Sequence, residues 1–194
     1  MDLKLLAWGR AAARRSGPGA LPVLWLFTDA DRLPDPVAAA ARLPKGIAGV
    51  VLRHDSHPDR VVIGRDLARI CRARRLALVV AGDVRLAASL GAGVHLRGGR
   101  WPGPLRRPGI VTSSAHTLPD LRRAARNGAS IAFLSPAFAT ASHPGEPALG
   151  ACRWPSLAAH AGLPVAALGG MDGDSVRRLP RRRCHAVGAI GALA

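Results

Sequence analysis

The 194-residue chain places polar side chains and glycines directly after a series of short apolar runs. The residues that follow these runs are Thr28, Asp29, Arg53, His54, Gly82, Asp83, His95, Ser113, Ser114, His116, Ser135, Gly169, Gly170 and Gly188. Arg53 is informative because an arginine that ends an apolar strand is costly to bury unless it meets an anion or a carboxylate. We therefore predict that Arg53 contacts an anionic ligand, with an ion pair to Asp83 as the structural alternative.

Two glycine-rich segments have the composition of phosphate-binding turns. Gly169 and Gly170 lie in LGGMDGDS, and Gly188 lies in AVGAIGALA. Backbone N–H groups in such turns can bind phosphate, because glycine lets an anion approach the backbone closely. Asp172 or Asp174 is a candidate cap for the helix expected next. A tight turn without a ligand is the alternative for the glycine pair.

The apolar runs alternate with stretches rich in alanine, leucine and arginine, which is the pattern of an α/β fold. Most runs are apolar at consecutive positions, as expected for parallel strands covered on both faces. We expect strands at residues 23–28, 49–53, 76–80, 93–96, 110–113, 131–134, 165–168 and 186–189. We expect helices at residues 36–42, 60–74, 84–90, 118–127, 154–160 and 173–179, after an arginine-rich N-terminal helix.

Eight strand–helix pairs fit a chain of this length only in a compact (β/α)8 TIM barrel, whose functional face lies at the carboxyl ends of the strands. We predict one such barrel over residues 21–194, preceded by an N-terminal helical extension over residues 1–20. The segment RGGRWPGPLRRPG is expected to replace one barrel helix. A doubly wound open sheet is the alternative, but such sheets usually have a glycine-rich turn where this chain has FTDADRL.

The composition limits the classes of partner. The formal net charge of +16 suggests nucleic acid, yet Lys4 and Lys45 are the only lysines and the aromatic residues that stack on bases are scarce. We therefore expect a small-molecule ligand and no nucleic acid. Cys71, Cys152 and Cys184 lack metal-ligand spacing, so we expect no disulfide or zinc. The sequence shows no signal peptide or membrane span, which predicts a cytoplasmic protein.

Five segments in order carry a resemblance to a known family. They are LWLFTD, GVVLRHD, VVAGDVRLAASLGAGVHL, TSSAHTLPDLRRAARNGASIAFLSPAFATASHPG and PVAALGGM. Within them, the elements GAGVHL, SxHTxxxxxxAxxxGA, SPxFxT and ALGG are specific in combination. Over residues 24–193 the chain resembles the thiamine phosphate synthase/TenI family, which contains thiamine phosphate synthase and the thiazole tautomerase TenI.

The resemblance implies a TIM barrel that binds a thiazole phosphate. The implied phosphate-binding residues are Gly169, Gly170, Gly188, Ala189 and Gly191. A synthase would also bind an aminopyrimidine pyrophosphate and join it to the thiazole. In that reaction Mg²⁺ and basic groups stabilise the departing pyrophosphate, and the thiazole nitrogen captures the pyrimidine methylene cation.

Several positions depart from the synthase pattern at the groups that hold pyrophosphate and metal. In the second strand, the usual glutamine, arginine and lysine are here Val51, Arg53 and Asp55, and after the third strand the usual Asn-Asp pair is Gly82 and Asp83. After the fourth strand, the usual Gly-Gln-Glu-Asp is replaced by Arg97, Gly98, Gly99 and Arg100. After the sixth strand, the usual Thr-x-Thr-Lys is replaced by Thr140, Ala141, Ser142 and His143. Asp83 is left as the candidate Mg²⁺ ligand. One hypothesis is that Arg97 and Arg100 replace the missing pyrophosphate-binding groups.

These departures favour the TenI branch, whose proteins lack much of the same pyrophosphate machinery. The tautomerase motif suggests His116 as the residue that moves a proton on a carboxythiazole phosphate, a role that suits histidine. A helix-start histidine bonded to backbone is the alternative. The candidate catalytic residues are thus His116 and Arg53. The candidate substrate-binding residues are Thr28, Asp83, His95, Ser114, Ser135, Thr140, Ser142 and His143, with structural roles as the alternative for the histidines.

We therefore expect a TenI-like thiazole tautomerase or a divergent relative of it. The alternatives are a thiamine phosphate synthase and a noncatalytic protein that binds a phosphate ligand. The expected ligand is a thiazole phosphate, together with an aminopyrimidine pyrophosphate if the chain is a synthase. The tautomerase reaction needs no cofactor, whereas the synthase reaction needs Mg²⁺. A homo-oligomer is compatible with the sequence.

Overall fold

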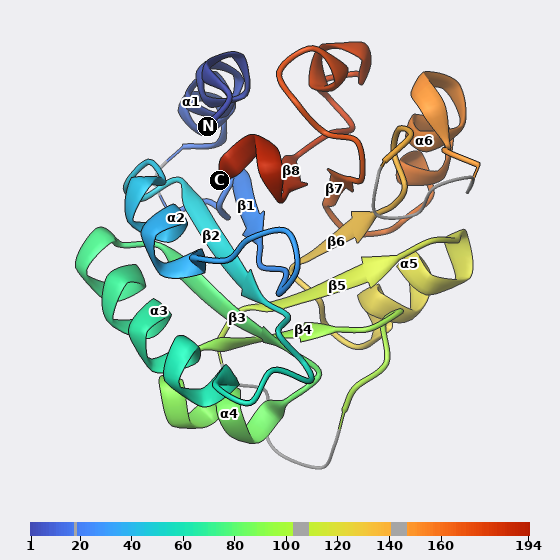
Figure 1. The fold of residues 1–194 in the computed structure, drawn as a ribbon. Helices are drawn as coiled ribbons and strands as arrows, with labels where there is room; N and C mark the ends of the chain where they lie inside the picture. The colour runs from blue at the N-terminus through green and yellow to red at the C-terminus, as the bar shows by residue number, and fades with distance from the viewer. Residues whose placement is uncertain (18, 103–108, 141–146) are drawn as a thin grey trace.

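The computed structural model describes residues 1–17, 19–102, 109–140 and 147–194. Eight parallel strands pair in sequence order, and the last pairs with the first to close a barrel (Figure 1). The prediction of a (β/α)8 TIM barrel is therefore confirmed, and the open-sheet alternative is wrong.

Each predicted strand is present, with small shifts at its ends. The strands are β1 (Leu24–Phe27), β2 (Ala48–Leu52), β3 (Ala77–Ala81), β4 (Gly93–Leu96), β5 (Val111–Ala115), β6 (Ile131–Leu134), β7 (Val165–Leu168) and β8 (Ala186–Ala189). The helices are α1 (Leu3–Ser16), α2 (Pro36–Arg42), α3 (Arg60–Arg74), α4 (Val84–Leu90), α5 (Leu118–Arg126) and α6 (Gly150–Ala159), with short 3-10 helices η1 (Ser175–Arg178) and η2 (Gly191–Leu193).

The helix expected at residues 173–179 is only the single turn η1. The N-cap residue is Asp174, which makes no side-chain cap bond; the Asp172 carboxylate instead accepts from the backbone N–H groups of Asp174 and Ser175 and fixes the turn before the segment. Pro180 follows directly and disfavours helical backbone in the residue before it. The segment between these two constraints has room for one turn.

Two other helix predictions differ in extent. The helix expected at residues 154–160 begins at Gly150, because it continues through Pro155 instead of starting beside it. The segment after β4 contains no helix within residues 97–102 and 109–110, and residues 103–108 lie outside the described part of the chain.

Two apolar layers hold the barrel together. Its interior is filled by one cluster, which consists of Trp25, Phe27, Val51, Val79, Ile131, Phe133, Ala166 and Ala186. The rings of Trp25 and Phe133 meet edge to face with centroids 5.7 Å apart. A larger cluster joins the outer face of the strands to the helices. The interior is therefore a packed core beneath the mouth and not an open channel.

Side-chain caps fix two of the loops at the mouth of the barrel. Asp83 accepts a hydrogen bond from the Leu86 backbone N–H at 2.9 Å and starts α4. Thr117 and Asp120 form a reciprocal capping box that starts α5. Because each helix starts soon after its strand, the loops that carry Gly82 and His116 are short and well defined.

Candidate active site at the carboxyl ends of the strands

A cavity of about 640 Å³ opens at the carboxyl ends of the strands. Most of the site residues predicted from sequence line it: Arg53, His95, Ser114, His116, Ser135, Thr140, Gly169, Gly170, Gly188, Ala189 and Gly191. Thr28 and Asp83 are not among its lining residues, and Ser142 and His143 lie outside the described part of the chain. The fold thus brings together residues from the ends of strands that are far apart in sequence.

The turn after β7 strongly favours glycine at two successive positions. Gly169 and Gly170 have φ angles of +86° and +63°, a left-handed backbone that other residues rarely adopt. A Cβ atom on Gly170 would lie 2.4 Å from the Ala139 carbonyl oxygen. On the neighbouring strand, a Cβ atom on Gly188 would lie 2.7 Å from the ring of Phe27. The backbone itself therefore forms this side of the cavity, and we call residues 169–170 and 188–191 the glycine cradle.

The N-terminal helix α1 is fastened to both segments that flank the glycine cradle. The Asp2 carboxylate accepts a hydrogen bond from the Gly173 backbone N–H at 2.7 Å, and the Asp2 N–H donates to the Ala192 carbonyl at 2.8 Å. Lys4 forms an ion pair with Asp174 at 2.9 Å. Figure 1 shows α1 beside η2 and the two chain ends close together.

Arg53 lies in a network on the β1 side of the cavity. Its guanidinium donates to the Asp29 carboxylate at 2.8 Å and to the Thr28 carbonyl at 3.0 Å. Hydrogen bonding from Arg32, which lies 2.6 Å from the same carboxylate, is the main cause that lowers the pKa of Asp29 to about 2. Burial lowers the pKa of Arg53. The suggested pairing of Arg53 with Asp83 is wrong, because Asp29 is its partner.

Thr28 supports this network from behind the cavity wall. Its side chain is fully buried, and its hydroxyl accepts a hydrogen bond from the Arg53 backbone N–H at 3.0 Å. The same hydroxyl lies 2.9 Å from Nδ1 of His54. Burial lowers the pKa of His54. Thr28 and His54 therefore hold the backbone of Arg53 and do not face the cavity.

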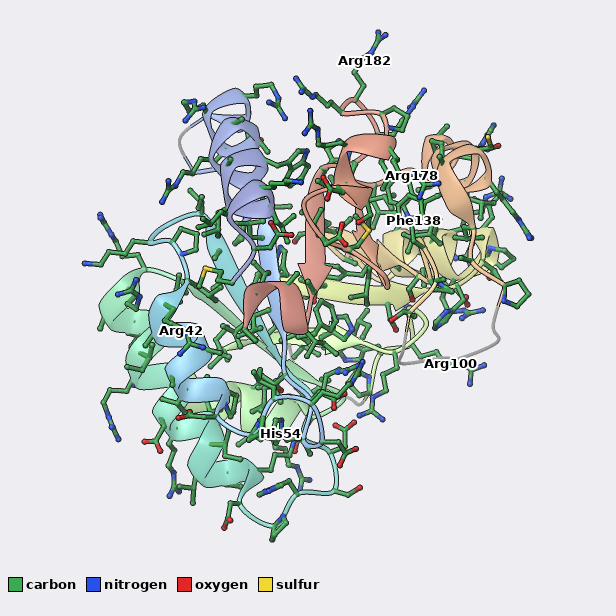
Figure 2. The ribbon with its side chains drawn as sticks, turned by 45° about the horizontal axis from the view of Figure 1, so that its top comes forward. Arg42, His54, Arg100, Phe138, Arg178 and Arg182 are labelled. Atoms are coloured by element: carbon green, nitrogen blue, oxygen red, sulfur yellow. The ribbon has the colours of Figure 1, made fainter. Side chains whose placement is uncertain are left out.

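A second ionic network links the ends of β2, β3 and β4. The Asp55 carboxylate binds Arg97 and also lies 3.2 Å from Arg60. Arg60 is 3.7 Å from Asp83, whose carboxylate caps α4. Arg97 and Asp55 line the cavity, whereas Arg100 is exposed and its side chain extends away from the ribbon in Figure 2.

His95 forms part of the cavity floor. It is 3% exposed, its Nδ1 lies 2.8 Å from the Thr112 hydroxyl, and its ring contacts those of Phe27 and Phe133. Burial, with a smaller contribution from Arg53, lowers the pKa of His95 to about 3. The imidazole is therefore neutral near pH 7 and can exchange hydrogen bonds without carrying charge.

His116 stands at the rim between β5 and β6. Its Nδ1 lies 3.0 Å from the Ser135 carbonyl oxygen, and the Ser135 hydroxyl is 3.4 Å from the same nitrogen. The His116 backbone N–H donates to Asp120 at 3.2 Å. Both the ring and the backbone of His116 are therefore oriented by neighbouring residues.

Sequence reasoning did not select Arg32, Pro136, Ala139 or Ala192, which also line the cavity. The spacing of three residues between Asp29 and Arg32 was a usable signal, since oppositely charged residues at that spacing often meet in a turn or helix. Pro136 and Ala139 gave no such signal, because they are brought in by packing against the glycine pair.

These features define a parallel TIM barrel whose mouth combines a backbone-built cradle with a wall of arginines. The chain belongs to the thiamine monophosphate synthase family, whose model matches residues 25–193. It is 32% identical to a thiamine-phosphate synthase of Parasynechococcus marenigrum over 83% of this chain and 48% of that protein. It is 28% identical to a putative thiamine-phosphate synthase 2 of Aquifex aeolicus over 88% of this chain and 94% of that protein.

A solved structure has the same fold. The thiamine phosphate pyrophosphorylase of Pyrococcus furiosus superposes with a TM-score of 0.72 at 22% identity, over 88% of this chain and 86% of that one. The family model and the 32% identical relative confirm the family resemblance inferred from sequence, and this structure confirms the fold. In the described part of the chain, no helix is both long and apolar enough to cross a membrane.

The carboxylates at this mouth do not fit the Mg²⁺ site that a synthase needs. Magnesium requires carboxylate oxygens that are free to coordinate it. Asp29 is bound by two arginines, Asp55 by two others, and Asp83 by the backbone of α4. Within the described residues, no three histidine, cysteine, aspartate or glutamate side chains gather around one point. The chain's own guanidinium groups occupy these carboxylates instead.

Proposed function

We propose that this chain binds a thiazole phosphate of thiamine biosynthesis and catalyses a proton shift on its ring, as a tautomerase. The hydrogen bond of His116 carries the proposal. Because the Ser135 carbonyl can only accept, Nδ1 of His116 holds the hydrogen in the neutral ring, and Nε2 keeps its lone pair. His116 also lines the same cavity as the glycine cradle. A histidine oriented in this way is suited to remove a proton from a ligand held there.

The proposed reaction balances within the substrate. Nε2 of His116 accepts a proton from a ring carbon, and the electrons of the broken C–H bond enter the conjugated ring. The Ser135 carbonyl stabilises the imidazolium through the Nδ1–H bond. The imidazolium then returns the proton to a different carbon of the conjugated system. No oxidant, reductant or second substrate is consumed.

The remaining cavity residues have supporting roles in this proposal. The glycine cradle binds the phosphate through backbone N–H groups. Arg53 supplies positive charge where the ring becomes electron-rich, and neutral His95 exchanges a hydrogen bond on the floor. Ser114 and Thr140 place hydroxyl groups on the wall. These groups fix the ring relative to His116, which is the geometric requirement of the proton shift.

Thiamine phosphate synthase is the second candidate, because the relatives at 32% and 28% identity carry that name. In that case Arg53 would face a pyrophosphate. The poor fit of the carboxylates to Mg²⁺ favours the tautomerase. A noncatalytic relative would use the same cradle and bind the thiazole phosphate without turnover.

The test measures conversion of a carboxythiazole phosphate between its tautomers by proton NMR, in EDTA. We expect turnover by the wild type and a loss of at least about 100-fold in kcat for His116→Ala. The matched control is His160→Ala. His160 also has its Nδ1 at a backbone carbonyl, that of Ser156 at 2.8 Å, but it ends α6 and is not among the cavity residues.

A parallel assay supplies aminopyrimidine pyrophosphate and thiazole phosphate with and without Mg²⁺. Thiamine phosphate formed only with Mg²⁺ would overturn the tautomerase proposal in favour of the synthase. Saturable binding of the thiazole phosphate without conversion in either assay would identify a noncatalytic protein. Equal activity of His116→Ala and wild type would remove His116 from the mechanism.

A further inference from the structure

Arg97 lines the cavity on the side opposite the glycine cradle. It directly follows β4, and in the closed barrel β4 is four strands away from β8 in either direction. Its side chain is 58% exposed, so a ligand in the cavity can reach it. A ligand whose phosphate lies in the cradle would therefore present its far end to Arg97.

The guanidinium of Arg97 lies in space that Gly82 leaves open. A Cβ atom on Gly82 would be 3.1 Å from Nε of Arg97 and 3.3 Å from its Cζ. Gly82 has a φ angle of +68°, and its N–H donates to the His95 carbonyl at 3.1 Å. The guanidinium of Arg97 therefore packs against the Gly82 backbone at the end of β3.

The turn that carries Arg97 is held firmly by α5. Arg123 donates to the Gly98 carbonyl at 2.5 Å, and Asn127 donates to the Gly99 carbonyl at 2.7 Å. A Cβ atom on Gly99 would lie 2.6 Å from the Ala124 backbone nitrogen. The backbone beneath Arg97 is thus ordered before any ligand arrives, which lowers the entropic cost of binding.

Among the described residues, the two ion-paired networks that contain Arg53 and Arg97 have four arginines and three aspartates in total. The arginines are Arg32, Arg53, Arg60 and Arg97, and the aspartates are Asp29, Asp55 and Asp83. Because Asp55 already has a second partner in Arg60, Arg97 can turn to an incoming anion without leaving that carboxylate unpaired.

We propose that Arg97 forms an oxyanion subsite that binds the second anionic group of the ligand, a carboxylate or a diphosphate, without a divalent cation. An arginine fork matches the paired oxygens of both groups. The two features that select Arg97 are its position on the cavity wall and its packing against Gly82. Arg100, in the same turn, has neither feature. The inference concerns binding alone and holds whether or not His116 moves a proton.

The test is calorimetric titration with inorganic pyrophosphate, in EDTA and again with Mg²⁺. We expect the wild type to bind equally well, within about twofold, in both conditions. Arg97→Gln should weaken pyrophosphate binding about tenfold, since it removes a charged hydrogen-bond donor. The same variant should leave inorganic phosphate, which we assign to the cradle, within about twofold of wild type. A second arm with malonate shows whether carboxylates use the subsite as well.

Arg100→Gln is the matched control, because it removes the same charge from the same turn at an exposed position. We expect it to bind pyrophosphate within about twofold of wild type. Gly82→Asn tests the packing of Arg97 against Gly82. Asparagine tolerates a positive φ angle, but its side chain would displace Arg97. Gly82→Asn and the double variant with Arg97→Gln should both match Arg97→Gln alone. A Mg²⁺ requirement in the wild type, or equal losses for Arg97→Gln and Arg100→Gln, would overturn the proposal.

Discussion

The two sides of the cavity differ in what lines them: mainly backbone on one side and charged side chains on the other. On the β7 and β8 side, the lining is mainly backbone: Gly169 and Gly170 turn through left-handed conformations against residues 136–139. On the β1 to β4 side, the lining consists of side chains joined in ion pairs, with Arg53 and Arg97 facing the space. One side presents fixed dipoles, and the other presents charges that can exchange partners.

This difference predicts different sensitivities. A backbone cradle carries no titratable group, so only a change in chain path can alter it. A wall of charges responds to pH and to single substitutions, and its field extends to buried groups beneath it. His95 is such a group: burial is the main cause of its lowered pKa, and Arg53 and Arg97 add to the shift.

The largest expected effect is the acid sensitivity caused by His95. Its pKa is about 3 in the folded protein and near 6.5 in the unfolded chain, so below pH 6.5 the unfolded state binds the proton first. Stability is therefore complete above pH 6.5 and falls as the pH drops toward 3, by up to about 5 kcal/mol. Urea unfolding between pH 7 and pH 4 should show this slope, and His95→Asn should flatten it.

The quantity to compare is the slope of stability against pH, because His95→Asn also changes packing and lowers stability at every pH. His160→Asn, at the exposed end of α6, should keep the wild-type slope. If wild type and His95→Asn lose stability in parallel as the pH falls, His95 is not the group that responds.

The backbone side is tested by Gly170→Ala. The added Cβ atom would lie 2.4 Å from the Ala139 carbonyl, and the left-handed backbone penalises any side chain. We expect a loss of about 3 kcal/mol in stability from these two causes together and about 100-fold weaker binding of inorganic phosphate. Thermal unfolding and calorimetry measure the two effects.

Gly162→Ala separates backbone strain from the shape of the cradle. Gly162 has a φ angle of +72°, but nothing lies within 4 Å of its would-be Cβ, and it is not among the cavity residues. It should lose about 1 kcal/mol of stability and keep full phosphate affinity. Equal phosphate binding by both variants would mean that the anion does not use the glycine cradle.

The strands could be predicted from sequence because buried parallel strands are continuous apolar runs, and here each run is bounded by glycine or polar residues. The length of η1 could not be predicted, because it depends on the turn held by the Asp172 carboxylate and on Pro180 acting together. The start of α6 was also missed, since Pro155 is tolerated inside the helix.

The positions after the strands predicted which glycines and which histidine, His116, line the cavity, but the sequence could not choose ion-pair partners. Asp29 follows β1 and Asp83 follows β3, and β2, which Arg53 follows, pairs with both strands. Packing alone selects Asp29. In the same way, the sequence offered Arg97 and Arg100 equally, and the conformation of the turn between them brings only Arg97 to the cavity.

The smallest expected effect concerns how the backbone side is held in place. Asp2 caps α1 through the Leu5 N–H and also binds Gly173 and Ala192 beside the cradle. Asp2→Ala should therefore lose about 1 kcal/mol of stability as a lost helix cap. It should also loosen the segment at Gly173, because the carboxylate bond to the Gly173 N–H is lost while the backbone N–H bond to Ala192 remains. Inorganic phosphate should therefore bind about tenfold more weakly in calorimetry, an effect of about 1.4 kcal/mol.

Asp35→Ala is the matched control for this last prediction. Asp35 caps α2 through the Ala38 N–H at 2.8 Å, and it is not among the cavity residues. Both variants should lose similar stability, but only Asp2→Ala should bind phosphate more weakly. If both keep wild-type affinity, the glycine cradle holds its shape without α1, and contacts within the barrel are sufficient to fix its backbone side.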